Sequence, residues 1–162
     1  MANNCTFNMK ITGFRNEDDK KLISDMFDIG YNRRKQLPVE LAHSIYESQV
    51  EDQEDGGIVI YGDCAWSVLC ALREEFRPVT KEGDTEFINL EELSRRFGVS
   101  IEYYSEELGM EFQEHCIIRD GKAETDECTD VEEHYPVGPD GEEDYDAEPY
   151  KVGGFGEWNW HI

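Results

Sequence analysis

Residues 99–131 constrain the fold most, because their apolar side chains recur at every second position. This period of two is typical of β-strands that bury one face. The apolar positions on that face are Val99, Ile101, Tyr103, Met110, Phe112, Cys116 and Ile118. Asp120-Gly121 predicts a two-residue hairpin turn, and the more polar return strand from Lys122 is typical of a sheet edge. We therefore predict a three-stranded antiparallel meander.

The N-terminal residues predict a strand, a turn and a helix. Residues 6–12 alternate between apolar and polar side chains, as a half-buried strand does. Asn16 is a good N-cap, and the carboxylates that follow it suit the positive end of the helix dipole. Apolar residues then recur at helical spacing as far as Phe27, and Gly30 is expected to end the helix.

The middle of the chain contains a less regular pattern. We interpret residues 31–56 as an insertion outside the core, in which Pro38 favours a short helix, although the alternation after it leaves a strand open. Residues 58–61 are β-branched or aromatic and predict a strand. Asp63 is expected to cap a second helix, which would place Arg73 on its solvent-exposed side.

A third helix is predicted after Asn89. Asn89 is its expected N-cap, with the Glu92 side chain reaching back in a capping box, and Gly98 is its expected end. The predicted order of elements gives an α+β fold, in which two to three helices cover one face of a mixed, largely antiparallel sheet. We expect residues 1–134 to form one α+β domain. Residues 135–162 are expected to form an acidic, Gly/Pro-rich tail without regular structure that ends in aromatic residues.

Acidity dominates the composition of the chain. Thirteen of the thirty-one residues from 120 to 150 are Asp or Glu, and only Lys122 is basic there. The net charge of the chain is −23. Residues 1–35 carry +2, so residues 36–162 carry −25. Such a surface repels nucleic acid and anionic membranes and is attracted to basic clefts, which are commonest in proteins that hold nucleic acid.

Several classes of function find no support in the sequence. No apolar run is long enough to span a membrane, and no signal-peptide pattern precedes residue 14. The five cysteines form no CxxC pair, which favours free thiols in a reducing cytoplasm. Cys64 at a helix start has no identifiable histidine partner, and P-loop, GxGxxG and GxSxG motifs are missing, so we do not predict an enzyme.

We also predict no metal or other cofactor. Zinc sites use tight ligand pairs, whereas the candidate donors are loosely spaced, so a structural role is favoured for them. These donors are His115, Cys116, Cys128 and His134. The stretch from Asp144 to Glu148 lacks the glycine and the ligand spacing of an EF-hand loop.

Three segments carry a family resemblance: the opening MANNCTFNMKITG, residues 61–67 (YGDCAWS), and residues 97–121. Together they resemble the YubB-like, ferredoxin-like family of phage and plasmid proteins. The resemblance covers about two thirds of the chain and rests on structural motifs. It implies a ferredoxin-like sheet and an origin in a mobile element, and it supplies no catalytic residues. Residues 31–56 and the acidic C-terminal third depart from the family.

These observations lead to one main expectation of function. The chain is expected to be a non-enzymatic inhibitor from a phage or other mobile element, of the anti-CRISPR type. Acting in the host cytoplasm, it would occupy the basic nucleic-acid cleft of a defence nuclease by acidic mimicry. The alternatives are an acidic phage accessory module that binds another basic protein, and a ferredoxin-like RNA-binding module.

The expected partner-binding residues comprise the carboxylates of the last third and two tryptophans. Glu124 and Asp126 are expected to present a row of charges that resembles a phosphate strand, because alternate strand residues lie about 6.6–6.8 Å apart. Trp158 and Trp160 would either dock on the protein's own core or anchor a partner. The full set is Glu124, Asp126, Glu127, Asp130, Glu132, Glu133, Asp140, Glu142, Glu143, Asp144, Asp146, Glu148, Trp158 and Trp160.

Overall fold

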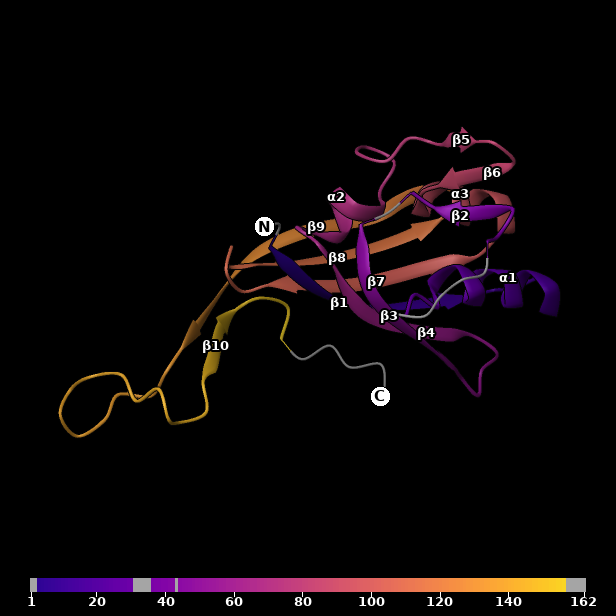
Figure 1. The fold of residues 1–162 in the computed structure, drawn as a ribbon. Coiled ribbons are helices and arrows are strands. Elements are labelled where there is room, and N and C mark those ends of the chain that lie inside the picture. Colours follow the sequence, from indigo (N-terminus) through magenta and orange to yellow (C-terminus); the bar gives the residue numbers. More distant parts are fainter. Residues whose placement is uncertain (1–2, 31–35, 43, 157–162) are drawn as a thin grey trace.

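The computed structural model describes residues 3–30, 36–42 and 44–156, and its main feature is a seven-stranded antiparallel sheet (Figure 1). The strand order across this sheet is β10-β9-β8-β7-β1-β4-β3. The strands are β1 (Asn4–Thr12), β3 (Ile45–Asp52), β4 (Ile58–Ala65), β7 (Ser100–Glu107), β8 (Phe112–Arg119), β9 (Lys122–His134) and β10 (Tyr150–Gly153). The predicted meander is therefore present as β7, β8 and β9.

A second, smaller sheet has the order β2-β6-β5. It contains β2 (Val39–Leu41), β5 (Thr80–Glu82) and β6 (Thr85–Ile88), and β2 pairs with β6 in parallel. The helices are α1 (Glu17–Phe27), α2 (Val68–Leu72) and α3 (Leu90–Phe97). The prediction of an α+β fold with a large, mostly antiparallel sheet and helices is confirmed. No helix of the described ranges is both long and apolar enough to cross a membrane.

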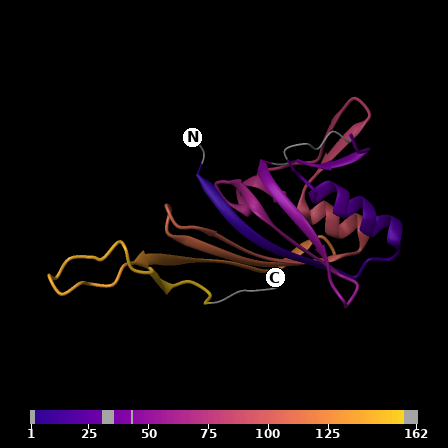
Figure 2. The same cartoon turned by 60° about the horizontal axis from the view of Figure 1, so that its bottom comes forward.

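The helices pack on one face of the large sheet and form the core with it (Figures 1 and 2). The strand register explains where this core is most apolar. Ile58, Ile11, Ile101 and Ile118 lie opposite one another on β4, β1, β7 and β8, and all four are fully buried. Toward the other end of the strands the same face contains buried polar side chains such as Ser105 and Glu114. The helix-covered face is therefore apolar at one end and hydrogen-bonded at the other.

Local signals in the sequence account for the helix ends. Asn16 accepts a hydrogen bond from the amide of Asp19 at 2.8 Å, and Asn89 accepts one from the amide of Glu92 at 2.8 Å. Gly98 follows α3 in the left-handed conformation, with φ of 66°. The capping box is incomplete, because the Glu92 carboxylate binds Arg95 and Arg96 instead of turning back. Helix α1 ends at Phe27, before the predicted Gly30.

Two predictions about the middle of the chain need correction. Residues 45–52, expected in an insertion outside the core, form strand β3 of the main sheet, paired with β4. The helix alternative after Pro38 is wrong, because residues 39–41 form strand β2. Proline excludes an amide donor but does not prevent a strand from starting one residue later.

The second helix also differs from its prediction. Strand β4 continues to Ala65, and α2 starts only at Val68 with Ser67 as its N-cap. Two further donors at this helix start, the amides of Val68 and Leu69, reach the buried Glu114 carboxylate at 2.9 and 3.2 Å. The helix start therefore depends on a side chain that lies far away in the sequence.

Strand β9 runs beyond its neighbour β8 and carries a long loop away from the body (Figure 1). The chain returns as β10, which pairs with residues 131–134 of β9. The sequence predicts no regular structure in residues 135–162. This prediction is wrong for residues 150–153, which form β10. Tyr150 and Val152 alternate with Lys151 and Gly153, but both side chains are about half exposed, so no buried face selects a strand here and pairing with β9 determines the conformation.

Candidate partner-binding surface

The projecting ribbon and loop form a surface that we call the acidic arm, defined as residues 130–153 (Figure 1). All nine of its carboxylates belong to exposed residues, and Lys151 is its single Lys or Arg. The carboxylates are Asp130, Glu132, Glu133, Asp140, Glu142, Glu143, Asp144, Asp146 and Glu148. Within the described residues, none of these nine forms an ion pair with a lysine or arginine. The arm therefore presents nearly all of its charge to solvent.

Hydrogen bonds within the loop give the arm a definite shape. The amide of Gly138 donates to the Glu142 carbonyl at 2.8 Å, and the amide of Asp144 donates to the Pro136 carbonyl at 2.8 Å. The Asp140 and Asp144 carboxylates accept from amides two residues ahead, as in Asx turns. The loop therefore closes on itself, and its carboxylates have defined positions.

Aromatic and aliphatic side chains lie exposed among these charges. Tyr145 is 70% exposed, Val137 68%, and Tyr150 and Val152 51% each. The Tyr145 ring packs on Tyr135 with 4.9 Å between centroids. Tyrosines surrounded by polar groups are typical of binding hot spots. These residues were missed in the sequence, where their recurrence between acidic residues was the only available signal.

The chain after the arm is tied to the sheet face opposite the helices. The amide of Phe155 donates to the Gln113 side-chain oxygen at 2.8 Å. The Phe155 ring packs edge-on against Tyr104 and His115, which stack on each other with centroids 4.2 Å apart. Lys151 bonds Glu106 at 2.5 Å on the same strand as Tyr104. These contacts fix the base of the arm.

The expected row of charges at Glu124 and Asp126 is interrupted. The β8–β9 register shifts between Ile117 and Ile118, which leaves Glu124 without an opposite residue. The Glu124 carboxylate accepts from Arg119 at 2.6 Å, whereas Asp126 accepts from the buried Arg73 at 3.3 Å. The two carboxylates therefore bind different arginines, and each is partly neutralised.

Two other predicted residues bind histidines. Glu127 lies 3.3 Å from Nδ1 of His115, and Glu132 lies 2.9 Å from Nε2 of His134. Trp158 and Trp160 lie outside the described residues. The structure thus brings the predicted carboxylates from residue 130 onward together on the arm and separates them from Glu124 and Asp126.

A buried polar cluster lies beneath α2 on the helix-covered face. Arg73, predicted on the solvent-exposed side of α2, is 4% exposed and donates to Glu91 at 2.5 Å and to the Tyr103 hydroxyl at 3.0 Å. Burial raises the pKa of Tyr103 well above its usual value and that of the Cys116 thiol to about 12, and Asp126 adds to the latter effect. These groups are occupied with one another, so the cluster stabilises the fold.

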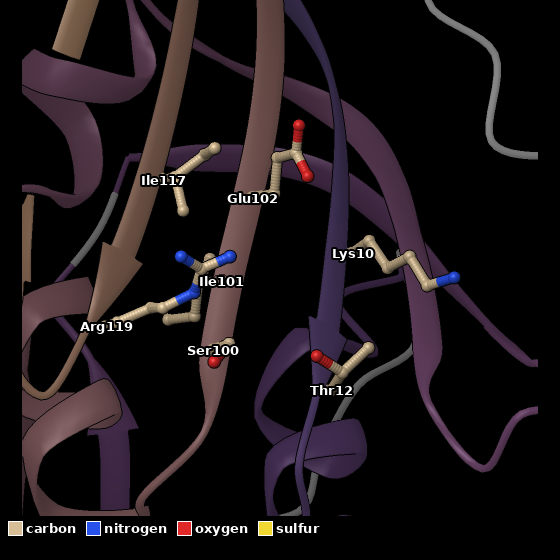
Figure 3. A pocket seen from close by; sticks show the side chains of 7 residues that line it. All are labelled: Lys10, Thr12, Ser100, Ile101, Glu102, Ile117 and Arg119. Carbon is tan, nitrogen blue, oxygen red and sulfur yellow. The ribbon is translucent and has the colours of Figure 1, made fainter. Parts of the chain in front are cut away.

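The opposite sheet face contains a shallow pocket of about 300 Å³ between β1, β7 and β8 (Figure 3). Its two cations are already paired, Lys10 with Asp55 at 2.9 Å and Arg119 with Glu124. Lys10 also extends away from Arg119 in Figure 3. The pocket therefore offers an anion little free positive charge. In the described part of the chain, no three His, Cys, Asp or Glu side chains gather closely enough to hold a metal ion.

Comparison of the chain with protein-family profiles, curated proteins and solved structures found no match.

Proposed function

We propose that this protein is a non-enzymatic inhibitor from a phage or other mobile element that acts in the host cytoplasm. Its partner would be the basic nucleic-acid cleft of a defence nuclease, with a CRISPR effector complex as the leading case. The observation that carries the proposal is the acidic arm, which presents nine exposed carboxylates and contains one lysine, Lys151, that binds Glu106 at its base. No core or cap requires these charges.

The physical basis is competition between like charges for one channel. A cleft that holds DNA or RNA neutralises phosphates with lysine and arginine, and the same side chains attract carboxylates. Asp130 and Glu132 keep the alternate spacing of a strand, about 6.6–6.8 Å. Because the arm projects, it can enter a channel that the wider body of the protein cannot. Association is expected to be fast and sensitive to salt.

We also propose that the central four strands are ferredoxin-like, as the resemblance to the YubB-like family implies. Their order, β7-β1-β4-β3, supports this proposal together with a helix after β1 and helices between β4 and β7. Strands β8, β9 and β10 would then be an extension that carries the arm.

The test compares two variants that remove equal charge. The arm variant combines Glu133→Gln, Glu142→Gln, Glu148→Gln and Asp146→Asn. The control combines Glu54→Gln, Glu75→Gln, Glu82→Gln and Asp84→Asn, which are exposed positions on the body. Each protein is titrated against purified CRISPR effector–guide complexes while target-DNA binding and cleavage are followed.

We expect the arm variant to need at least about tenfold more protein for half-inhibition, and the control to stay within about twofold of the unmodified chain. Added target DNA should relieve the inhibition. Equal losses in both variants, or no binding to any effector complex, would contradict the proposal. Binding that survives high salt but is lost on Tyr145→Ala would instead favour a protein-interaction module anchored by its aromatic residues.

A further inference from the structure

One edge of the main sheet is uncovered next to the acidic arm. Strand β9 spans residues 122–134, but β10 pairs only with residues 131–134. Residues 122–130 are bound to β8 on one side, and most of them are exposed. The opposite edge differs, because the amide of Ser48 on β3 donates to the Ile29 carbonyl at 3.0 Å. Among the residues that the structure describes, β3 is thus partly covered at its outer edge, whereas residues 122–130 of β9 have no strand paired on their outer side.

Hydrogen bonds at the base of the arm show which main-chain groups of β9 point outward. The Asp130 carbonyl accepts from the amide of Gly154 at 2.9 Å on the β10 side, whereas the amide of Val131 donates to the Glu111 carbonyl on the β8 side. Main-chain direction alternates along a strand, and the register from Phe112–Asp130 to Ile117–Thr125 is unbroken. The amides and carbonyls of Cys128 and Asp126 therefore point away from β8, toward the free edge.

The protein's own strand cannot continue along this edge. Gly153 and Gly154 have φ of +83° and +73°, which turns the chain away from β9 after one hydrogen bond to Asp130. Phe155 is then held by Gln113 on the sheet face. The edge from Asp126 to Cys128 is left as a place where a further strand could pair.

The side chains around this edge indicate the chemistry of such a strand. Asp126 and Asp130 alternate on one face, and Glu127 lies on the other, so carboxylates flank both sides of the free main chain. Charged residues on an edge strand also discourage self-association. They disfavour an acidic strand, including a second copy of this one, and favour a strand that carries lysine or arginine at alternate positions.

We propose that the partner adds an extended, lysine- or arginine-bearing segment to the free edge of β9, pairing with the main chain of Asp126 and Cys128 while the acidic arm holds the adjacent basic surface. This inference rests on the proposed function, since it assumes a basic protein partner. Main-chain pairing would supply the register that charge attraction alone lacks.

The experiment uses the full chain and two synthetic peptides of equal charge, followed by amide hydrogen exchange and NMR. One peptide alternates lysine with valine and threonine, and the other replaces the valines and threonines with proline, which cannot donate to a strand. We expect the first peptide to slow exchange at the amides of Asp126 and Cys128 by at least about tenfold. Thr125 and Thr129, which face β8, should change little.

The Cys128→Pro variant removes an outward amide and should weaken binding of the first peptide by about tenfold, whereas Cys128→Ala should not. If the first peptide shifts only the signals of the acidic arm, without protection at Asp126 and Cys128, the edge inference is wrong and the proposed function stands. Failure of the effector assay together with failure of both peptides to bind would overturn the proposed function and the edge inference together.

Discussion

Arg73 is the residue on which the polar half of the core depends. Its side chain contacts Glu91, Tyr103, Cys116 and Asp126, which belong to α3, β7, β8 and β9. Glu91 is 6% exposed and also accepts the amide of Glu74 at 2.9 Å. The arginine charge therefore compensates a carboxylate that is shielded from water, and it links α2 to the strands that carry the acidic arm.

Arg73→Met should lower the free energy of unfolding by about 3–5 kcal/mol, because it leaves the buried Glu91 carboxylate without its cation. Urea denaturation followed by circular dichroism measures this loss. The double variant Arg73→Met with Glu91→Gln should recover part of it, since no unpaired charge remains. A single variant as stable as the unmodified protein would contradict the assigned role.

The buried carboxyl group of Glu114 should make the stability of the protein depend on pH. Burial raises the pKa of its carboxyl group, although bonds from Ser105 and from the amides of Val68 and Leu69 oppose the shift. A raised native pKa means that the folded state binds the proton more tightly than the unfolded state does. The stability that this proton contributes is present below the unfolded pKa and is lost as the pH rises through the native pKa.

Glu114→Gln keeps the shape and stays neutral at every pH. We therefore expect the stability of the unmodified protein relative to Glu114→Gln to fall as the pH rises above about 4, the ordinary pKa of a glutamate. Urea denaturation of both proteins across this range measures the difference. A constant difference would mean that the hydrogen-bond donors balance burial, and a change in the opposite direction would mean that they outweigh it.

At the scale of elements, the segment after β10 determines how the acidic arm is attached. Gly154 combines a positive φ of +73° with a close approach, since an added Cβ would lie 2.4 Å from the Gln113 side-chain oxygen. Gly156 has a similar φ of +77°, but an added Cβ there meets nothing within 4 Å. Alanine at Gly156 would therefore introduce backbone strain alone, whereas alanine at Gly154 would introduce strain and a steric clash with Gln113.

Gly154→Ala should release Phe155 from Gln113, while Gly156→Ala should not. We expect amide exchange at Phe155 to accelerate at least about tenfold in the first variant and by less than about threefold in the second. Equal acceleration in both would show that strain alone, and not the contact with Gln113, determines how the segment docks.

For the whole molecule, the net charge of −23 opposes folding through self-repulsion. The described basic side chains relieve it locally, for example Lys20 with Asp52 at 2.9 Å and Lys21 with Asp25 at 2.9 Å. The acidic arm has little such relief. Salt should therefore raise the melting temperature, and much of this increase should come from screening the charges of the acidic arm.

Raising sodium chloride from about 20 to about 300 mM should increase the melting temperature by about 2–4 °C, which corresponds to about 1 kcal/mol of relieved repulsion in a chain of this size. Differential scanning calorimetry measures the shift. The arm variant of the inhibition assay should show a smaller increase, because four of the repelling charges are absent. A melting temperature that falls with salt would mean that the ion pairs outweigh the repulsion.

The sequence by itself determined the elements whose signals are local. The caps at Asn16 and Asn89 and the Asp120-Gly121 turn depend on atoms a few residues apart. The alternation in β1 and β7 depends only on which face is buried, because slipping a strand by one residue would expose every apolar side chain. The α+β class and the acidic C-terminal third follow from the same kind of information.

Only the tertiary structure decided the features that join distant residues. Arg73 is buried because Glu91 and Asp126 meet it there, and α2 starts at Val68 because Glu114 accepts its amides. The bulge at Glu124 separates two carboxylates that a simple period of two would align. Strand β10 forms by pairing with β9, because the alternation of Tyr150 and Val152 spans only four residues and buries no apolar face. In each case the stabilising partner lies on another element, so the energy that selects the conformation appears only once the chain has folded.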